Sequence, residues 1–149
     1  MSNRVLITGS TGFLAGYLIK ELKKKLIYEV FGITDEKNSQ DTIKNTYSLD
    51  IRDRDKLFEV IKTIKPDIVF HLAAITNVGF AWKNQKLTHE VNFIGSLNLL
   101  EALSENGLNK TRIIICTIYS NSCYICNFCF HFLMYGNFSY LIPISISCI

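Results

Sequence analysis

Charged residues and cysteines are missing from long parts of this sequence. No Asp, Glu, Lys or Arg follows Arg112, although the 149 residues include 16 basic and 13 acidic side chains, for a formal net charge of +3. So small a net charge provides no basic surface for nucleic acid, which we exclude as an expected partner. No cysteine precedes Cys116, so we expect no disulfide bonds before that residue.

The start of the chain also lacks the long apolar segment of a secretory signal. Residues 1–4 lead directly into the short apolar run Val5–Ile7, and a glycine-rich turn follows. A secretory signal would need a basic start and then roughly 7–15 apolar residues. We therefore expect a cytoplasmic protein.

The composition changes abruptly after Arg112. The residues beyond it are rich in Ile, Phe, Tyr and Cys, with Ser and Asn between them. They follow neither a helical period nor the alternation of a strand. We interpret residues 116–149 as an apolar tail outside the pattern of residues 1–115, produced by a wrong reading frame or a retained non-coding stretch.

Two functional alternatives for this tail remain open. Cys123, Cys126 and Cys129 have the spacing of metal ligands, with His131 close by. The length of the apolar segment would also permit a membrane span. No fourth ligand has its expected context, and Asn and His residues interrupt the apolar segment, so we expect neither a metal site nor a membrane span.

Before Arg112, short apolar runs alternate with segments of helical spacing. We expect strands at Val5–Ile7, Tyr28–Ile33, Thr46–Leu49, Ile68–Leu72 and Arg112–Ile115. A first helix would bury Leu14, Leu18, Ile19, Leu22 and Leu26, and a second would bury Leu57, Val60, Ile61 and Ile64. A third, long helix is expected over Leu87–Glu105, with Gly107 as its stop. Strands that alternate with helices predict an α/β fold with a parallel sheet covered on both faces.

A glycine-rich turn separates the first expected strand from the first helix. Gly9 permits a tight turn, Gly12 lets a pyrophosphate approach the backbone, and Ala15 lets the helix pack closely on the sheet. The helix N-terminus then presents free N–H groups and a partial positive charge to phosphates. This arrangement predicts a nucleotide-binding turn, and the alternative is a turn with a purely structural role.

Acidic residues follow the second and third expected strands. Asp50 could accept a hydrogen bond from an adenine amino group, with Ile51 against the ring, although Asp50 and Asp53 could instead only cap the next helix. Asp35 follows the second strand, where a carboxylate favours the ribose 2′-OH of NAD and a basic residue favours the 2′-phosphate of NADP. Because Lys37 is nearby, the cofactor is NAD or NADP, with a preference for NAD.

Three segments carry a family resemblance: Thr8–Leu14, Phe70–Trp82 with its His-Leu-Ala-Ala stretch, and Val91–Ala102. Together they resemble the extended short-chain dehydrogenases/reductases, in the NAD-dependent epimerase/dehydratase family. Within that family the segments are most similar to the GDP-mannose 4,6-dehydratases, and nearly as similar to the GDP-4-keto-6-deoxymannose reductases. The resemblance covers roughly residues 3–115.

The resemblance implies a Rossmann-type doubly wound sheet that binds NAD(P), in an enzyme of nucleotide-sugar metabolism whose substrate is a GDP-sugar. It implies cofactor contacts from Gly9, Thr11, Gly12, Phe13, Leu14, Asp35, Asp50, Ile51, Leu72, Ala73 and Ala74. Asn92 would support the central sheet. Ala73 and Ala74 could equally serve close packing between helix and sheet.

Two further residues allow alternative interpretations. His71, at a strand end, is more readily explained as a structural histidine with satisfied hydrogen bonds than as a proton carrier. Trp82 could face a substrate or belong to the core.

The acid–base pair of the family is missing from this chain. Enzymes of the family use a tyrosine followed four residues later by a lysine, on one helical face. The last lysine here is Lys110, and the residues four places after the later tyrosines Tyr119, Tyr124, Tyr135 and Tyr140 are Cys123, Phe128, Ser139 and Ile144. We therefore assign no catalytic residue and expect a truncated, inactive N-terminal portion of such an enzyme. The alternatives are a non-catalytic dinucleotide-binding module and a protein tethered to a membrane by its tail.

Overall fold

The computed structural model describes residues 3–36 and 43–116. Strands and helices alternate along these residues, as the sequence predicts, except that the second and third strands follow each other with no helix among the described residues between them. Their order is β1 (Asn3–Thr8), α1 (Phe13–Lys23), β2 (Tyr28–Thr34), β3 (Asn45–Ser48), α2 (Arg54–Ile64), β4 (Ile68–His71), α3 (Val78–Lys83), α4 (Gln85–His89), η1 (Glu90–Ile94), α5 (Gly95–Glu105) and β5 (Arg112–Ile115).

Within the described residues, the strands form one parallel sheet in the order β3-β2-β1-β4-β5. The central strand β1 pairs with β2 on one side and β4 on the other, so that Val5 lies opposite both Val30 and Ile68. This is the strand order of the first half of a doubly wound dinucleotide-binding sheet. The predicted fold class is confirmed.

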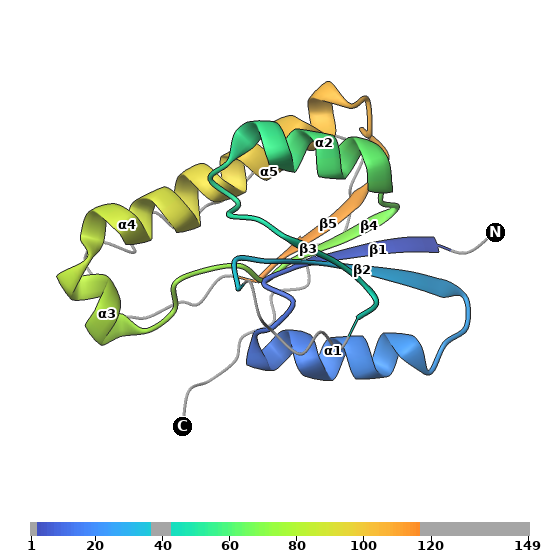
Figure 1. The fold of residues 1–149 in the computed structure, drawn as a ribbon, viewed down its shortest axis with the longest axis horizontal. Helices are drawn as coiled ribbons and strands as arrows, with labels where there is room; N and C mark the ends of the chain where they lie inside the picture. The colour runs from blue at the N-terminus through green and yellow to red at the C-terminus, as the bar shows by residue number, and fades with distance from the viewer. Residues whose placement is uncertain (1–2, 37–42, 117–149) are drawn as a thin grey trace.

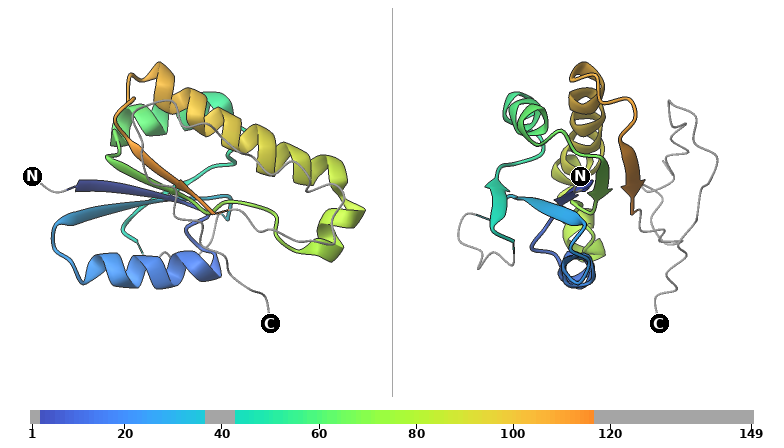
Figure 2. Two further views of the ribbon diagram at one scale, coloured as in Figure 1. Left: turned by 180° about the vertical axis from the view of Figure 1, so that it is seen from behind. Right: turned by 90° about the vertical axis from the view of Figure 1, so that its right-hand side faces the viewer.

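Helices cover both faces of the sheet. Helix α1 lies on one face, and α2 and α5 lie side by side on the other (Figures 1 and 2). Helices α3 and α4 extend beyond the edge at which the strands end, away from the rest of the sheet (Figure 1).

The core has two parts because side chains alternate along the strands. Val5 and Ile7 of β1 pack with Ala15 and Ile19 of α1, whereas Leu6 faces the opposite layer with Leu57 of α2. The hydrophobic effect therefore fixes the side of the sheet that each helix covers.

The buried face of α1 differs from the face expected from its leucines. The helix ends at Lys23, so Leu26 lies beyond it and is 97% exposed, while Leu14 is 44% exposed. Ala15 and Ile19 are the residues that pack fully on the sheet. Ala15 is small, so the first turn of the helix can lie close to the strands.

The long helix expected over Leu87–Glu105 is interrupted. It begins at Gln85, and its central turn is the π-helix η1, which separates α4 from α5. Apolar spacing predicts a helix over this stretch, but it does not show which of its turns has π-type hydrogen bonds. The preceding helix α3 was not expected either, because it buries no side chain that would produce a periodic apolar pattern.

Within residues 3–36 and 43–116, no helix is long and apolar enough to cross a membrane. Residues 117–149 lie outside the described residues. The interpretation of the tail, the metal-ligand spacing of its cysteines and its possible membrane span all concern that part of the chain.

Helix α2 ends on a residue with unfavourable backbone geometry. Lys65 has φ 49° and ψ 64°, in the left-handed region, and its N–H donates to the Ile61 carbonyl oxygen at 2.8 Å. A residue with a Cβ is strained there, whereas glycine is not. Pro66 follows directly and cannot continue the helix.

We therefore predict that Lys65→Gly raises the free energy of unfolding by about 0.5–1 kcal/mol, because it removes this strain. The matched control is Lys62→Gly inside α2, which should lower it by about 0.5–1 kcal/mol, since glycine disfavours helical backbone. Urea denaturation of the three proteins measures both changes. A loss of stability in Lys65→Gly as large as in the control would contradict the prediction.

Candidate functional site

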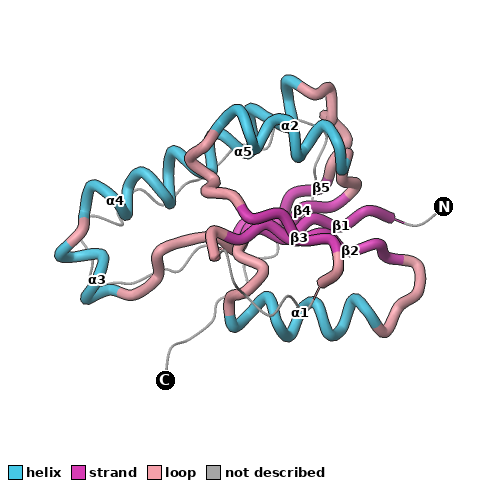
Figure 3. Tube along the Cα trace, in the orientation of Figure 1, coloured by secondary structure: helices cyan, strands magenta, loops and turns pink. Residues whose placement is uncertain are grey.

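The segments that follow β1, β2, β3 and β4 leave the sheet at one edge (Figure 3). In open parallel sheets, ligands bind outside the carboxyl ends of the strands. Every predicted contact residue lies in one of these segments or at the start of α1. The topology therefore collects the predicted site at this edge.

The turn after β1 presents backbone N–H groups at the start of α1. Gly9 has φ 68°, and its carbonyl oxygen accepts from the Gly12 N–H at 3.0 Å. Gly12 is the N-cap of α1, and no side chain caps the helix there. Because Thr11, Gly12 and Phe13 are exposed, the positive end of the helix is open to an anion.

Gly9 lies directly against the segment that leaves β4. A Cβ atom at Gly9 would be 2.9 Å from both the N and the Cα of Ala73, and 3.0 Å from the carbonyl carbon of Leu72. These distances are too short for any side chain. The structure thus brings the glycine-rich turn together with Leu72 and Ala73, which are both among the predicted contact residues.

The end of β2 is tied to the same turn. The hydroxyls of Thr34 and Thr11 are 3.1 Å apart, and the Ser10 N–H donates to the Ile33 carbonyl oxygen at 3.0 Å. The Thr34 hydroxyl also accepts from the Glu36 N–H at 3.2 Å. Asp35, held between these contacts, is exposed at the edge of the sheet.

At the exit of β3, two neighbouring carboxylates have different roles. Asp53 caps α2 by accepting from the Lys56 N–H at 3.2 Å. Asp50 does not cap the helix. It accepts from the Arg52 N–H at 2.9 Å, and from the Arg52 guanidinium, Nε and Nη2, at 3.0 and 2.6 Å. Its hydrogen bond with Arg52 lowers the pKa of Asp50, which stays an acceptor at neutral pH.

Arg52 also connects this exit to the long helix. Its Nη1 donates to Glu90 of η1 at 3.1 Å, and both side chains are more than a third exposed. Exposed pairs of this kind contribute little to stability. Their effect here is to fix the guanidinium between two carboxylates at the edge of the site.

Ile51 points away from the edge and into the core. It is 5% exposed, and a Cβ atom at Gly95 would be 2.5 Å from its Cδ1. The Asn98 side chain donates to the Ile51 and Arg52 carbonyl oxygens, each at 3.1 Å. Only the backbone of Ile51 can therefore face a ligand in this conformation.

His71 is buried between the sheet and the long helix. Its Nδ1 is 2.6 Å from the Thr8 hydroxyl, and its Nε2 is 2.8 Å from the Ser96 hydroxyl. Burial lowers the pKa of His71 to about 4. This is a neutral histidine with two partners, as the structural interpretation predicts.

The side chain of Asn92, in η1, binds the backbone of the segment after β4. Its Oδ1 accepts from the Ile75 N–H at 2.8 Å, and its Nδ2 donates to the Ile75 carbonyl oxygen at 3.0 Å. Both backbone groups of Ile75 are thereby bound to one side chain of η1. The π-helical turn is thus the part of the long helix that holds the β4 exit.

Sequence reasoning missed the partners of these residues. Thr8 and His71 are opposite each other in adjacent strands, so their side chains must share a face. A polar residue at the end of each of two adjacent strands is a signal that could have predicted the Thr8–His71 hydrogen bond. Trp82, in contrast, is 61% exposed on α3 and does not belong to the core.

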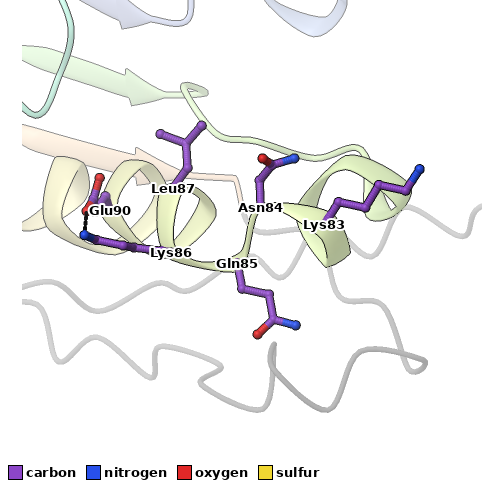
Figure 4. Close-up of a pocket in the computed structure, with 6 residues that line it drawn as sticks. All are labelled: Lys83, Asn84, Gln85, Lys86, Leu87 and Glu90. Atoms are coloured by element: carbon purple, nitrogen blue, oxygen red, sulfur yellow. Dashed lines mark ion pairs between the residues drawn. The ribbon is translucent and has the colours of Figure 1, made fainter.

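A surface hollow of about 380 Å³ lies elsewhere, at the junction of α3 and α4 (Figure 4). Lys83, Asn84, Gln85, Lys86, Leu87 and Glu90 line it, and none of them belongs to a strand end. In the part of the chain that the structure describes, no three His, Cys, Asp or Glu residues could together hold a metal ion.

Comparison with known proteins places these features in context. The family model described as the NAD dependent epimerase/dehydratase family matches residues 5–124. The UDP-glucose 4-epimerase of Mycoplasma genitalium is 40% identical over 111 residues, which cover 68% of this chain and 32% of the relative. The GDP-mannose 4,6-dehydratase of Yersinia enterocolitica is 34% identical over 125 residues, which cover 73% and 33%.

Solved structures agree with the fold. The Thermus thermophilus UDP-glucose 4-epimerase, crystallised in complex with NAD, superimposes with a TM-score of 0.66 at 29% identity, over 70% of this chain and 35% of that one. The chain therefore spans about a third of the length of the relatives it matches.

The buried His71 makes stability depend on pH in a defined window. The unfolded imidazole titrates near pH 6.5 and the folded one at about 4. As the pH falls, the unfolded chain therefore binds the proton first. The stabilisation linked to His71 is complete above pH 6.5 and is lost progressively toward pH 4.

We predict that the free energy of unfolding contributed by His71 falls by about 2 kcal/mol between pH 7 and pH 5. The control is His71→Gln, which removes this titration and leaves all others. Urea denaturation of both proteins at the two pH values measures the difference. Equal pH dependence in the two proteins would show that His71 does not titrate as its burial requires.

Proposed function

The chain belongs to the NAD dependent epimerase/dehydratase family, and on that premise we propose that it binds NAD(P) at the strand-end site. It would be the dinucleotide-binding portion of a nucleotide-sugar dehydratase, epimerase or reductase. The observation that carries this proposal is the uncapped N-terminus of α1 at Gly12, which opens beside the exits of β1, β2 and β4.

The pyrophosphate would lie on the glycine-rich turn. Gly9, Thr11, Gly12, Phe13 and Leu14 supply this turn, and its exposed N–H groups have the charge and direction that a phosphate requires. The nicotinamide-side ribose would be bordered by Leu72, Ala73 and Ala74, the first two of which also lie against Gly9.

The adenine would lie over the exit of β3. The Asp50 carboxylate would accept from the adenine amino group, since an ionised carboxylate offers more acceptor sites than its bonds to Arg52 occupy. Ile51 would contribute through its backbone, because its side chain is committed to Gly95.

We favour NAD over NADP. Asp35 is exposed directly after β2, where a carboxylate binds the 2′-OH of a ribose and repels a 2′-phosphate. Lys37, the residue that could favour NADP, lies outside the described residues.

The sugar nucleotide of the parent enzyme is proposed on sequence similarity alone. Our first candidate is a GDP-sugar of the GDP-mannose type, because the segments that carry the family resemblance are most similar to that branch. A UDP-sugar is the second candidate, favoured by the 40% identity to the Mycoplasma genitalium epimerase. Dinucleotide binding without catalysis remains the alternative for the chain by itself.

Dinucleotide binding predicts a sharp effect of Gly12→Val. A Cβ atom at Gly12 would be 3.1 Å from the Gly9 carbonyl oxygen, and the branched side chain would occupy the space of the pyrophosphate. We expect the Kd for NADH to rise by more than about tenfold.

The matched control is Gly16→Val, one helical turn further on, where a Cβ atom meets nothing within 4 Å. NADH fluorescence titration of the three proteins gives the Kd values. Equal affinity of Gly12→Val and Gly16→Val would show that the turn is not the binding site.

We also predict that this chain alone does not turn over GDP-mannose or its 4-keto-6-deoxy derivative. Its 149 residues contain no tyrosine followed four positions later by lysine, and losing a positioned acid–base group typically costs about 10²–10⁴-fold in rate. The test is chromatography of nucleotide sugars after incubation with NAD(P). Product at a rate typical of the family would refute the prediction and reveal a base that is not recognised here.

A further inference from the structure

We propose that the Thr8 hydroxyl, oriented by its hydrogen bond to His71, positions the dinucleotide by holding the Ala73 N–H against the Gly9 turn. The inference rests on the proposed function and adds to it a residue that does not itself touch the cofactor. It starts from a chain of hydrogen bonds that joins β1, β4 and the long helix.

The direction of each hydrogen bond in this chain follows from its neighbours. The Ser96 hydroxyl donates to the Asn92 carbonyl oxygen at 2.7 Å, so its oxygen is left to accept from the His71 Nε2–H at 2.8 Å. The His71 Nδ1 therefore carries no proton and accepts from the Thr8 hydroxyl at 2.6 Å. The Thr8 oxygen in turn accepts from the Ala73 N–H at 3.2 Å.

The other neutral form of His71 satisfies fewer groups. With the proton on Nδ1, the Nε2 atom would need the Ser96 proton, and the Asn92 carbonyl oxygen would lose that donor. The Thr8 proton would then have no acceptor, because the Nδ1–H points at the same oxygen. A buried donor without an acceptor is costly, so the network fixes the Nε2–H form.

The Thr8–Ala73 hydrogen bond continues the pairing of β1 and β4 by one bond beyond their last backbone hydrogen bond. The final ladder bond between the two strands runs from the Leu72 N–H to the Thr8 carbonyl oxygen at 3.2 Å. The next N–H, that of Ala73, is bound by the Thr8 side chain instead. That same peptide is the one that a Cβ atom on Gly9 would approach to 2.9 Å.

This arrangement links the two halves of the proposed dinucleotide site. The Gly9 turn would hold the pyrophosphate, and the segment after Ala73 would border the nicotinamide-side ribose. A fixed Ala73 peptide sets the distance between the turn and this segment. Loss of the Thr8–Ala73 hydrogen bond should therefore weaken the binding of NADH, which would contact both. The binding of ADP, which would occupy the turn and the adenine side only, should not change.

The variants alter Thr8, because replacing His71 would change the hydrogen bonds of both the Thr8 and the Ser96 hydroxyl at once. Thr8→Val keeps the shape of the side chain and removes the hydroxyl, whereas Thr8→Ser retains it. Thr111→Val is the matched control. The Thr111 hydroxyl is also buried and donates to the Pro66 carbonyl oxygen at 2.7 Å, at the opposite edge of the sheet.

The experiment measures the Kd values of NADH and ADP for the wild type and the three variants. We expect Thr8→Val to raise the Kd for NADH by about tenfold, the loss of roughly one hydrogen bond, and to leave that for ADP unchanged. Thr8→Ser should restore NADH binding. Thr111→Val should lower the melting temperature as Thr8→Val does, with both affinities unchanged.

Amide hydrogen exchange provides a second readout. Thr8→Val should speed exchange at Ala73 and not at Leu72, and Thr8→Ser should reverse the effect. Faster exchange at Ala73 with unchanged NADH affinity would overturn the proposal, because the hydrogen bonds of Thr8 would then have a purely structural role. An equal rise in both Kd values would overturn it too, since the turn itself would have changed. A wild type that binds neither ligand refutes the proposed function itself, and the inference with it.

Discussion

The contact between Gly9 and Ala73 is the constraint on which the rest of the site depends. No side chain fits between them, since a Cβ on Gly9 would be 2.9 Å from the Ala73 backbone. Because Gly9 has no Cβ atom, it also adopts a left-handed conformation, which turns the chain sharply out of β1. Helix α1 then begins at the edge of the sheet with its first N–H groups directed outward. The binding turn and the β4 exit are thus parts of one packed unit.

The long helix formed by α4, η1 and α5 contacts the segments that leave β3 and β4. Gly95 lets the helix approach the β3 exit so closely that Ile51 fills the space of its missing side chain. One turn earlier, Asn92 binds both backbone groups of Ile75. Asn92 belongs to the π-helical turn η1, so the interrupted part of the long helix is the part that holds the β4 exit.

The sequence predicted the features that repeat and missed those that depend on single contacts. The parallel sheet follows from alternating apolar runs, and the stop at Gly107 follows from a backbone that only glycine adopts easily. Leu26 was wrongly assigned to the buried face of α1, because apolar spacing does not say where a helix ends. The separate roles of Asp50 and Asp53 were left open, because both lie close to Arg52 in the sequence; only the contact of Arg52 with Glu90 is long-range. The cofactor contacts themselves stay predictions.

The electrostatics of the site come from the backbone rather than from cationic side chains. The turn from Gly9 to Leu14 contains no lysine or arginine, and the histidine beneath it is neutral because burial lowers its pKa to about 4. The guanidinium of Arg52 is neutralised by Asp50 and Glu90. A phosphate at this edge would therefore be attracted by the dipole of α1 and by directed N–H groups. Fixed dipoles act only at short range and in one direction, so affinity depends on how accurately the turn is held. Under the proposed function, that dependence would give the neutral hydrogen bonds of Thr8 and His71 a greater influence on binding than their lack of charge suggests.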